Sequence, residues 1–242
     1  MSAKVLIYGG SGGMGSITGQ KLRAEGYDLH ITGRDAARLS AVAHELDAGF
    51  TAGDVTDAAF FSRVAEEAGD TLAGLVYAVG TLQLRSLQRF SEAEFLQDYR
   101  VNALGAALAV QAALPALKKS ADGASVVLFS SLATFQGFPL HASVGMAKGA
   151  INGLTLALAA ELAPRVRVNA IAPSVTRTPL GDAVLSNEQM AAVIAAAHPL
   201  QRLGQPEDPA ALAAFLISSE SGWITGQVIS VDGGRSTLRT KG

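Results

Sequence analysis

A glycine-rich turn near the start of the chain has residue types and spacing that suit phosphate binding. Gly9, Gly13 and Gly15 lie between an apolar run and a stretch with helical periodicity. Glycines let backbone N–H groups approach a pyrophosphate, with the positive end of a helix dipole behind them. The spacing G-x-x-x-G-x-G differs from the common G-x-G-x-x-G fingerprint, and a tight strand–helix turn without a ligand is the alternative. The predicted cofactor contacts here are Gly9, Ser11, Gly13, Met14 and Gly15.

The end of the second apolar run indicates which nicotinamide cofactor fits. An acidic residue there would hydrogen-bond the ribose 2′-hydroxyl and repel a 2′-phosphate. Gly33 has no side chain at the expected acidic position, and Arg34 offers a planar guanidinium suited to phosphate. Asp35 is placed to cap the next helix. The sequence therefore predicts NADP(H) over NAD(H), with a solvated surface arginine as the alternative for Arg34.

Composition and charge exclude several classes of protein. The 242 residues are 49% hydrophobic and 17% charged, with a formal net charge of −2 and no cysteine. No Lys/Arg cluster offers a face for nucleic acid, so no such partner is expected. The absence of cysteine excludes disulfides and thiolate nucleophiles. No metal site is predicted, because the four histidines are scattered without ligand spacing.

Neither a membrane span nor a secretory signal is predicted. The apolar stretches Ala103–Leu117 and Ile151–Leu162 are interrupted by glycine, proline or polar residues. Both are shorter than the ~18–20 clean residues that a span needs. The apolar run at the N-terminus has five residues and stops at glycine, unlike a signal peptide. We expect a soluble cytoplasmic protein.

Strand-type runs alternate with helical segments along the whole chain. The predicted strands are Val5–Tyr8, Leu29–Thr32, Leu72–Tyr77, Ser125–Ser130, Val166–Ile171 and Val228–Val231. The predicted helices are Met14–Ala24, Ala36–Glu45, Ala58–Ala68, Glu92–Ala109, Val144–Leu162, Asn187–Ala197 and Pro209–Ser218. This alternation implies parallel strands with right-handed crossovers. We predict a single α/β domain over residues 1–242: a Rossmann-like, doubly wound parallel sheet of about seven strands flanked by helices.

The stretch Pro173–Gly204 lies between a strand and a helix and has a helical middle, so it is predicted to be a lid. From Leu180 to Leu203 it carries apolar residues at helical spacing. These residues would line a pocket wall or seal the lid against the domain: Val184, Leu185, Met190, Val193 and Ile194.

Several motifs occur in the order in which one protein family has them. They are the glycine turn, Asp54-Val-Thr-Asp57, Val101-Asn102, Ser131 with Lys148, Pro173-Ser-Val-Thr-Arg-Thr178 and Trp223–Gly234. With these motifs the chain resembles a classical short-chain dehydrogenase/reductase over essentially all 242 residues. The resemblance implies hydride transfer with a nicotinamide cofactor and a small carbonyl or alcohol substrate.

The resemblance also implies roles for individual residues. Asp54 and Val55 would contact adenine, and Asn102 would help to organise a catalytic water. The implied cofactor contacts are Asp54, Val55, Gly80, Lys148, Pro173, Thr176 and Thr178. One motif departs from the family, because Asn-Asn-Ala-Gly is here Tyr77-Ala78-Val79-Gly80, which loses an asparagine that braces the sheet.

The second departure lies at the position of the proton donor. The family places a tyrosine thirteen residues after its serine and four before its lysine, and that position is Val144 between Ser131 and Lys148. In the family the tyrosine gives a proton to the carbonyl oxygen, the lysine lowers its pKa, and the serine holds the carbonyl. A valine cannot donate a proton, and loss of a general acid typically costs about 10²–10⁴ in rate.

The predicted catalytic set is therefore Ser131, Lys148 and Asn102, with His141 as a substitute acid three residues before Val144. An ordinary histidine pKa of about 6.5 suits proton transfer near neutrality, but a surface or capping role is the alternative. Lys148 keeps a second implied role, a hydrogen bond to the nicotinamide ribose. For Ser131 and Lys148 the alternatives are a turn residue and a helix-surface lysine.

Two functions follow from these residues. One is an NADP(H)-dependent oxidoreductase with an altered proton donor. The other is a catalytically silent NADP(H)-binding sensor or non-catalytic subunit of a mixed oligomer. Ser131 and Asn102 favour the first, and Val144 favours the second. In either case we expect a homo-oligomer, a tetramer or dimer, assembled through the apolar helices near Glu92–Ala109 and Val144–Leu162.

Overall fold

The computed structural model describes residues 3–182, 184–185 and 187–240. In this part of the chain, seven strands form one parallel sheet in the order β3-β2-β1-β4-β5-β6-β7. The strands are β1 Lys4–Tyr8, β2 Asp28–Gly33, β3 Gly49–Ala52, β4 Gly74–Tyr77, β5 Ala124–Phe129, β6 Val166–Pro173 and β7 Val228–Val231. The strand order reverses between β1 and β4, where doubly wound sheets bind ligands. The predicted fold class is confirmed.

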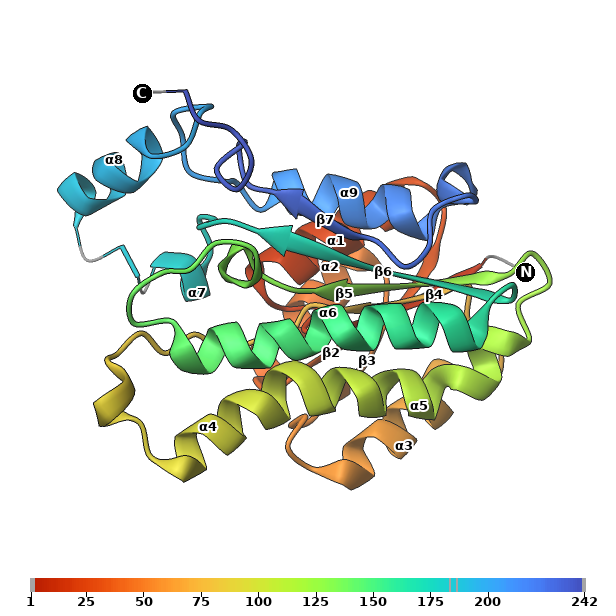
Figure 1. The fold of residues 1–242 in the computed structure, drawn as a ribbon. Helices are drawn as coiled ribbons and strands as arrows, with labels where there is room; N and C mark the ends of the chain where they lie inside the picture. Colours follow the sequence, from red (N-terminus) through yellow and green to blue (C-terminus); the bar gives the residue numbers. More distant parts are fainter. Residues whose placement is uncertain (1–2, 183, 186, 241–242) are drawn as a thin grey trace.

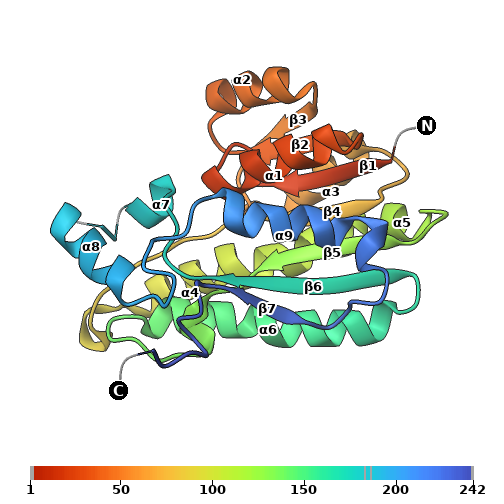
Figure 2. The ribbon, with the colours of Figure 1, turned by 90° about the horizontal axis from the view of Figure 1, so that it is seen from above.

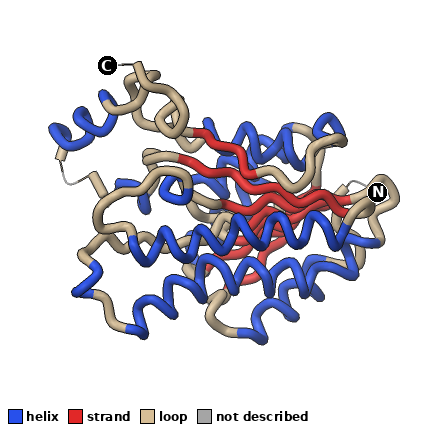
Figure 3. Tube along the Cα trace, in the orientation of Figure 1, coloured by secondary structure: helices blue, strands red, loops and turns tan. Residues whose placement is uncertain are grey.

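Helices cover both faces of this sheet (Figure 1, Figure 2). The helices are α1 Gly13–Ala24, α2 Ala36–Leu46, α3 Ala58–Ala68, α4 Glu92–Tyr99, α5 Gly105–Lys118, α6 Ala142–Leu162, α7 Pro179–Asp182, α8 Glu188–Ala196 and α9 Glu207–Ile217. Helices α1, α2 and α9 pack on one face, and α3, α5 and α6 pack on the other. Figure 3 shows the strands enclosed between these two helical layers.

Strand β1 is apolar from Val5 to Tyr8 because the sheet is buried on both faces there. In β1, Val5 and Ile7 belong to the core under α1, α2 and α9, whereas Leu6 and Tyr8 belong to the core under α3, α5 and α6. All four side chains have no exposed surface. A strand whose alternate residues enter two cores has no polar face, which is why the sequence shows continuous apolar runs.

Two elements differ from the prediction. Strand β3 was missed, because its four residues begin with glycine and expose Phe50 by 42%, so no apolar run marks it. The predicted helix Glu92–Ala109 was too short. A π-helical turn at Arg100–Leu104 joins α4 to α5, so the helix continues to Lys118.

The joined helix bears on the membrane prediction. Glu92–Lys118 has 27 residues and a mean hydropathy of 1.3 in its most apolar window, enough to cross a membrane by length and composition. In the described residues it is the one helix that meets this test. Of that window 56% is buried inside the protein, and α5 packs on the sheet. A core helix can meet the same test as a membrane span.

The predicted lid forms α7 and α8 beyond the end of β6 (Figure 1). Its two ends are joined: the N–H of Gly204 donates to the Val175 carbonyl over 3.0 Å, and that of Arg177 to the Gly204 carbonyl over 2.9 Å. Ala183 and Ser186, which fall in the predicted lid, lie outside the described residues. The segment therefore leaves the sheet and returns at two points that are hydrogen-bonded to each other.

Candidate active site

The site lies at the carboxyl edge of the sheet, where β1, β4, β5 and β6 end. The pairing of Phe129 with Ile171 places Ser131, two residues after β5, level with Pro173. A cavity of about 240 Å³ opens there. The predicted residues on its wall are Met14, Gly80, Ser131, His141, Val144, Lys148, Pro173, Thr176, Thr178 and, from the lid, Val184 and Ile194. One cavity thus gathers residues from the loops after β4, β5 and β6 and from the first turn of α1.

The glycine turn after β1 admits no side chain at two of its positions. Gly9 has φ +78°, a left-handed conformation that favours glycine. A Cβ added at Gly15 would lie 2.2 Å from the Gly9 carbonyl oxygen. Gly12 precedes α1 without any side-chain cap, so the N–H groups of the first turn face the opening. A turn kept free of side chains in front of a helix terminus fits a pyrophosphate.

Thr178 packs directly against this turn. A Cβ at Gly13 would lie 2.7 Å from Thr178 Cγ2, so the loop after β6 and the turn after β1 are in contact. Thr178 is buried, and its Oγ1 accepts a hydrogen bond from the Gly181 N–H over 3.0 Å. The structure therefore brings together two predicted phosphate-binding segments that lie far apart in the sequence.

The predicted selectivity residues lie at the ends of β2 and β3. Arg34 is exposed, and its charge, after the hydrogen bonds that Asp54 accepts from Thr56, helps to hold the pKa of Asp54 below its usual value. Asp35 caps α2 as predicted, because its Oδ1 accepts from the Arg38 N–H over 3.0 Å. A Cβ at Gly33 would lie 2.5 Å from Ser11 Oγ. An acidic side chain at position 33 would therefore meet Ser11.

Val55 and Ser131 have local roles in addition to those predicted. The Val55 side chain is buried in the core beside α3. Ser131 Oγ accepts a hydrogen bond from the Ala133 N–H over 3.1 Å and begins a short 3₁₀ turn at Leu132–Thr134. The turn-residue alternative for Ser131 describes this contact, but Ser131 also lies on the cavity wall.

Lys148 is a buried cation on the cavity wall. It lies one turn beyond Val144 on α6, and the two are 7% and 3% exposed. Lys148 Nζ donates to the Phe129 carbonyl over 2.8 Å. Burial without a carboxylate partner lowers the pKa of Lys148 to about 8. The helix-surface alternative for Lys148 is therefore wrong.

Asn102 reaches the site through its neighbours. It is fully buried in the π-helical turn, and its Nδ2 donates to Thr81 Oγ1 over 2.7 Å and to the Asp98 carbonyl over 2.9 Å. A Cβ at Gly80 would lie 3.0 Å from Asn102 Oδ1 and 3.4 Å from Lys148 Nζ. Because Gly80 has no side chain, Asn102 and Lys148 can lie close together. Thr81, and not Asn102, lies on the cavity wall.

His141 is half-buried at the start of α6 and lines the cavity. Its Nδ1 lies 2.7 Å from the Pro139 carbonyl oxygen, and its ring packs on Phe138 with centroids 5.3 Å apart. It makes no side-chain hydrogen bond to cap α6. Because the carbonyl can only accept, Nδ1 carries the proton and Nε2 is the basic nitrogen.

Tyr77 and Tyr99, two tyrosines that could in principle donate a proton, do not lie on the cavity wall. Tyr77 is buried and donates from its hydroxyl to the Val101 carbonyl over 2.7 Å. Burial raises the pKa of Tyr77 far above its usual value. Tyr99 is 40% exposed on α4.

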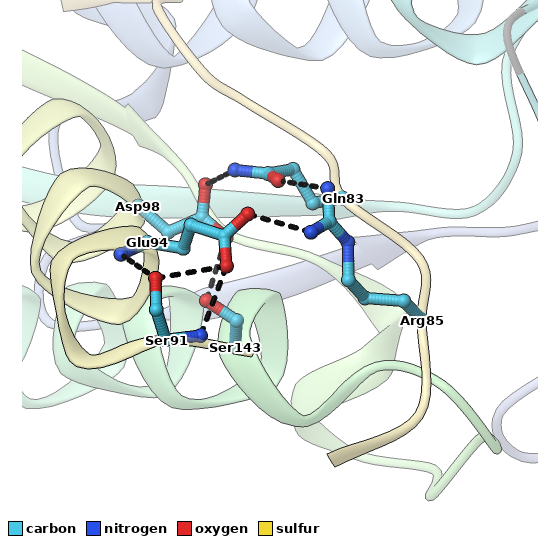
Figure 4. A network of polar contacts seen from close by, with 6 residues as sticks. All are labelled: Gln83, Arg85, Ser91, Glu94, Asp98 and Ser143. Carbon is cyan, nitrogen blue, oxygen red and sulfur yellow. Dashed lines mark hydrogen bonds and ion pairs between the residues drawn. The ribbon is translucent and has the colours of Figure 1, made fainter. Parts of the chain in front are cut away.

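Sequence reasoning missed a buried polar network beside the cavity. Asp98 has no exposed surface, and its carboxylate accepts from Ser143 Oγ over 2.6 Å and from Thr81 Oγ1 over 2.7 Å. Figure 4 shows Asp98 between Ser143 of α6 and Gln83 of the loop after β4. One signal was available: Asp98 lies one helical turn before Asn102.

Two further residues were missed. Ser174 follows β6 and lines the cavity, and His198 follows α8 with its ring 2% exposed. Ser174 Oγ lies 2.7 Å from His198 Nε2. They are 24 residues apart, a spacing that carries no signal in the sequence. In the described residues no group of three or more His, Cys, Asp or Glu side chains could hold a metal ion.

Comparisons with known proteins agree with this geometry. Residues 9–236 match a family model described as enoyl-(acyl carrier protein) reductase. L-2,3-butanediol dehydrogenase of Corynebacterium glutamicum is 33% identical over 258 residues, 97% of this chain and 98% of that protein.

Solved structures have the same fold. A short-chain type dehydrogenase/reductase from Mycobacterium ulcerans superposes with a TM-score of 0.92 at 27% identity, over 99% of this chain and 92% of that one. The structure of ElxO with NADP bound superposes with a TM-score of 0.90 at 29% identity, over 98% of this chain and all (100%) of that one.

Proposed function

Because the chain belongs to the short-chain dehydrogenase/reductase family of oxidoreductases, we propose that it is an NADP(H)-dependent member that interconverts a small alcohol and its carbonyl compound without a tyrosine proton donor. The observation that carries this proposal is the cavity wall on which Ser131 and Lys148 flank Val144. A bound nicotinamide would supply or accept the hydride.

The cofactor proposal rests on the glycine turn and on Arg34. The turn can keep its conformation only because Gly9 and Gly15 lack side chains, since a Cβ at Gly9 would lie 2.9 Å from the Ala78 carbonyl oxygen and one at Gly15 would lie 2.2 Å from the Gly9 carbonyl oxygen. Arg34 is exposed at the end of β2, where its guanidinium can meet a 2′-phosphate. Lys148 would hold the nicotinamide ribose. The similarity to ElxO, a protein with an NADP-bound structure, supports the same cofactor.

Two residues at the site, Ser131 and Asn102, support turnover in addition to binding. Ser131 projects from the end of β5 and offers a hydroxyl for a substrate oxygen. Asn102 is held beside Gly80 and Lys148 by three hydrogen bonds. His141 stays the predicted substitute acid. Ser131 lies on the cavity wall and Asn102 lies behind it, next to Thr81. A protein that only binds the cofactor has little need of either residue.

The second candidate is a catalytically silent NADP(H)-binding sensor or non-catalytic subunit, and Val144 is the observation that favours it. Its buried isopropyl group faces the cavity and offers no proton. Such a protein would use the glycine turn, Arg34 and Lys148 for binding alone.

One pair of measurements tests both candidates. A fluorescence titration with NADPH and NADH should give tight, selective NADPH binding, and binding of neither nucleotide contradicts both proposals. The Val144→Tyr variant is then assayed for carbonyl reduction. Some activity in the wild type and a gain of about 10²-fold or more in the variant support the oxidoreductase. Activity in the variant alone supports the silent binder.

We further propose that the protein acts on a small-molecule substrate in the cytoplasm and assembles as a homotetramer or dimer. Helices α4 and α6 pack together and expose large apolar side chains: Leu96 58%, Tyr99 40%, Met146 51% and Leu156 59%. Burial between subunits would remove these side chains from water. A monomeric mass by light scattering would contradict the assembly.

A further inference from the structure

We propose that Ser174 and His198 form a proton relay that serves the reacting oxygen of the substrate and that this relay, in place of His141, takes the role that Val144 cannot fill. The inference rests on the proposed oxidoreductase function and names the groups that move its proton. Ser174 follows Pro173 at the end of β6, and His198 lies 24 residues further along the chain. Neither Ser174 nor His198 takes part in the contacts proposed above.

The geometry of the pair is that of a hydroxyl bonded to a base. Ser174 Oγ lies 2.7 Å from His198 Nε2, and His198 Nδ1 lies 2.7 Å from the Ile194 carbonyl oxygen. Since a carbonyl oxygen can only accept, Nδ1 carries the ring proton in the neutral histidine. Nε2 is then free to accept the proton of the Ser174 hydroxyl. The Ile194 carbonyl therefore selects the tautomer that can act as a base toward Ser174.

The register of the sheet places Ser174 next to the reacting groups. Ser131 is level with Pro173 on the neighbouring strand, so Ser174 lies one residue beyond Ser131 at the same edge. Both residues line the cavity with Lys148. We expect a substrate oxygen bound between these strand ends to meet the Ser174 hydroxyl, whereas the Val144 side chain has no group to offer it.

A second cavity lies at the other end of the proposed relay. This cavity, of about 310 Å³, is lined by both Ser174 and His198. Its wall also carries three charged side chains, Arg202, Asp208 and Asp232. Ser174 thus lies on both cavities and can pass a proton from one to the other.

The proposed step balances as follows. In alcohol oxidation the substrate C–H bond gives its hydride to the bound nicotinamide, and the substrate O–H proton passes to Ser174 Oγ. The Ser174 proton passes at the same time to His198 Nε2, which becomes an imidazolium and later releases that proton to water in the second cavity. Carbonyl reduction is the reverse, with the imidazolium as the source of the proton.

The direction of the pH dependence follows from the surroundings of His198. Burial and the charge of Arg235 lower the pKa of His198, while the Ile194 hydrogen bond and the carboxylate of Asp232 oppose this shift. Arg202 and Asp208 are the other charged groups on the second cavity. The ring is therefore neutral near pH 7, the form that oxidation needs. Oxidation should fall as the pH falls through this lowered pKa, and reduction should rise.

The test compares Ser174→Ala and His198→Gln with two matched controls. Ser218→Ala removes a serine hydroxyl at the end of α9, and His44→Gln removes an exposed imidazole on α2. The assay is NADP⁺-dependent oxidation of 2,3-butanediol and cyclohexanol from pH 5 to pH 9. NADPH binding by fluorescence and ¹⁵N NMR spectra of the histidine rings are recorded on the same proteins.

We expect Ser174→Ala and His198→Gln to oxidise alcohols about 10²-fold or more slowly, with unchanged NADPH binding and a flattened pH profile. The NMR spectra should show the neutral His198 ring with its proton on Nδ1. The Ser174→Ala substitution should shift the Nε2 resonance of His198. Both controls should match the wild type. If His198→Gln fails to fold, Ser174→Ala carries the test, because it removes only one oxygen atom.

Two results overturn the relay alone: wild-type turnover that Ser174→Ala leaves unchanged, or a His198 ring protonated on Nε2 when neutral. Loss of activity in His141→Ala with full activity in Ser174→Ala would assign the proton transfer to His141 instead. A wild type that binds NADPH and oxidises neither alcohol nor reduces the matching ketones contradicts the proposed function, and the relay with it.

Discussion

Lys148 Nζ donates a hydrogen bond to the carbonyl oxygen of Phe129 over 2.8 Å, which fixes an ammonium group of α6 against the end of β5. No phenol stands one turn before it, because position 144 is valine. The ammonium is therefore buried beside an apolar side chain, and it donates a hydrogen bond to a neutral carbonyl group. This pairing explains why its pKa falls, since burial disfavours the charged form.

The first prediction concerns stability at alkaline pH. Lys148 has a pKa of about 8 in the folded protein against a usual value of 10.5, so from about pH 8 to 10.5 the unfolded chain binds more protons. The free energy of unfolding should rise with pH over this interval. Lys148→Met should remove this part of the rise, as measured by urea unfolding at pH 7.5 and 9.5. Lys118→Met, at an exposed position on α5, should keep the wild-type slope.

The second prediction concerns the glycine turn. An added methyl group at Gly15 would lie 2.2 Å from the Gly9 carbonyl oxygen, so Gly15→Ala must displace the turn. We expect the variant to bind NADPH at least about 10-fold more weakly, or about 1.4 kcal/mol, and to unfold at a lower temperature. Gly153→Ala is the control, since nothing lies within 4 Å of its added methyl group on α6. This control should gain about 0.5–1 kcal/mol of stability. Unchanged NADPH affinity in Gly15→Ala would place the nucleotide elsewhere.

The third prediction concerns cofactor selectivity. Arg34→Leu should weaken NADPH binding by about 10-fold and leave NADH binding unchanged, because a charged hydrogen bond to the 2′-phosphate contributes about 1.5–3 kcal/mol. Arg38→Leu, on an exposed residue of the adjacent helix α2, should change neither affinity. Added salt should narrow the NADPH preference of the wild type by screening an exposed charge. Equal effects of Arg34→Leu on both nucleotides would contradict the assignment.

The fourth prediction concerns the buried carboxylate. Asp98→Ala would leave the hydroxyls of Ser143 and Thr81 without their acceptor in a place that water reaches poorly. We expect a loss of about 1–3 kcal/mol of stability for each donor that stays unsatisfied, measured by urea unfolding. Asp122→Ala, in an exposed turn, should change stability little. A loss equal to that of Asp122→Ala would mean that water replaces the carboxylate.

Local patterns predicted most of the fold because the central strands are buried on both faces. Val5–Tyr8 is a continuous apolar run, and it is found within β1. Strand β3 could not be recognised, since Phe50 is exposed at the edge of the sheet and Gly49 begins the strand. The π-helical turn could not be recognised either. One extra residue in a helical turn does not change the apolar pattern visibly where apolar residues follow one another closely.

The candidate site could be predicted where its residues lie in ordered motifs, as do Ser131, Lys148 and Gly15. It could not be predicted where contact depends on the return of a long loop. Asp98 has the sequence pattern of a helix-surface charge, and its burial depends on Ser143 from another helix. Ser174 and His198 meet only because the lid leaves the sheet and comes back at Gly204.

The hydrogen-bonded base of that lid has a consequence for how the length and sequence of the lid can change. Residues between Thr176 and Gly204 are joined at their base by backbone hydrogen bonds that do not depend on the lid's own sequence. A loop closed at its base can be lengthened at little cost, since each doubling of length adds only about 0.6 kcal/mol of closure entropy. The part of the lid between Thr178 and His198 is therefore exchangeable: new lengths and side chains there would reshape substrate preference while the sheet, the nucleotide turn and the Ser174–His198 pair stay as they are.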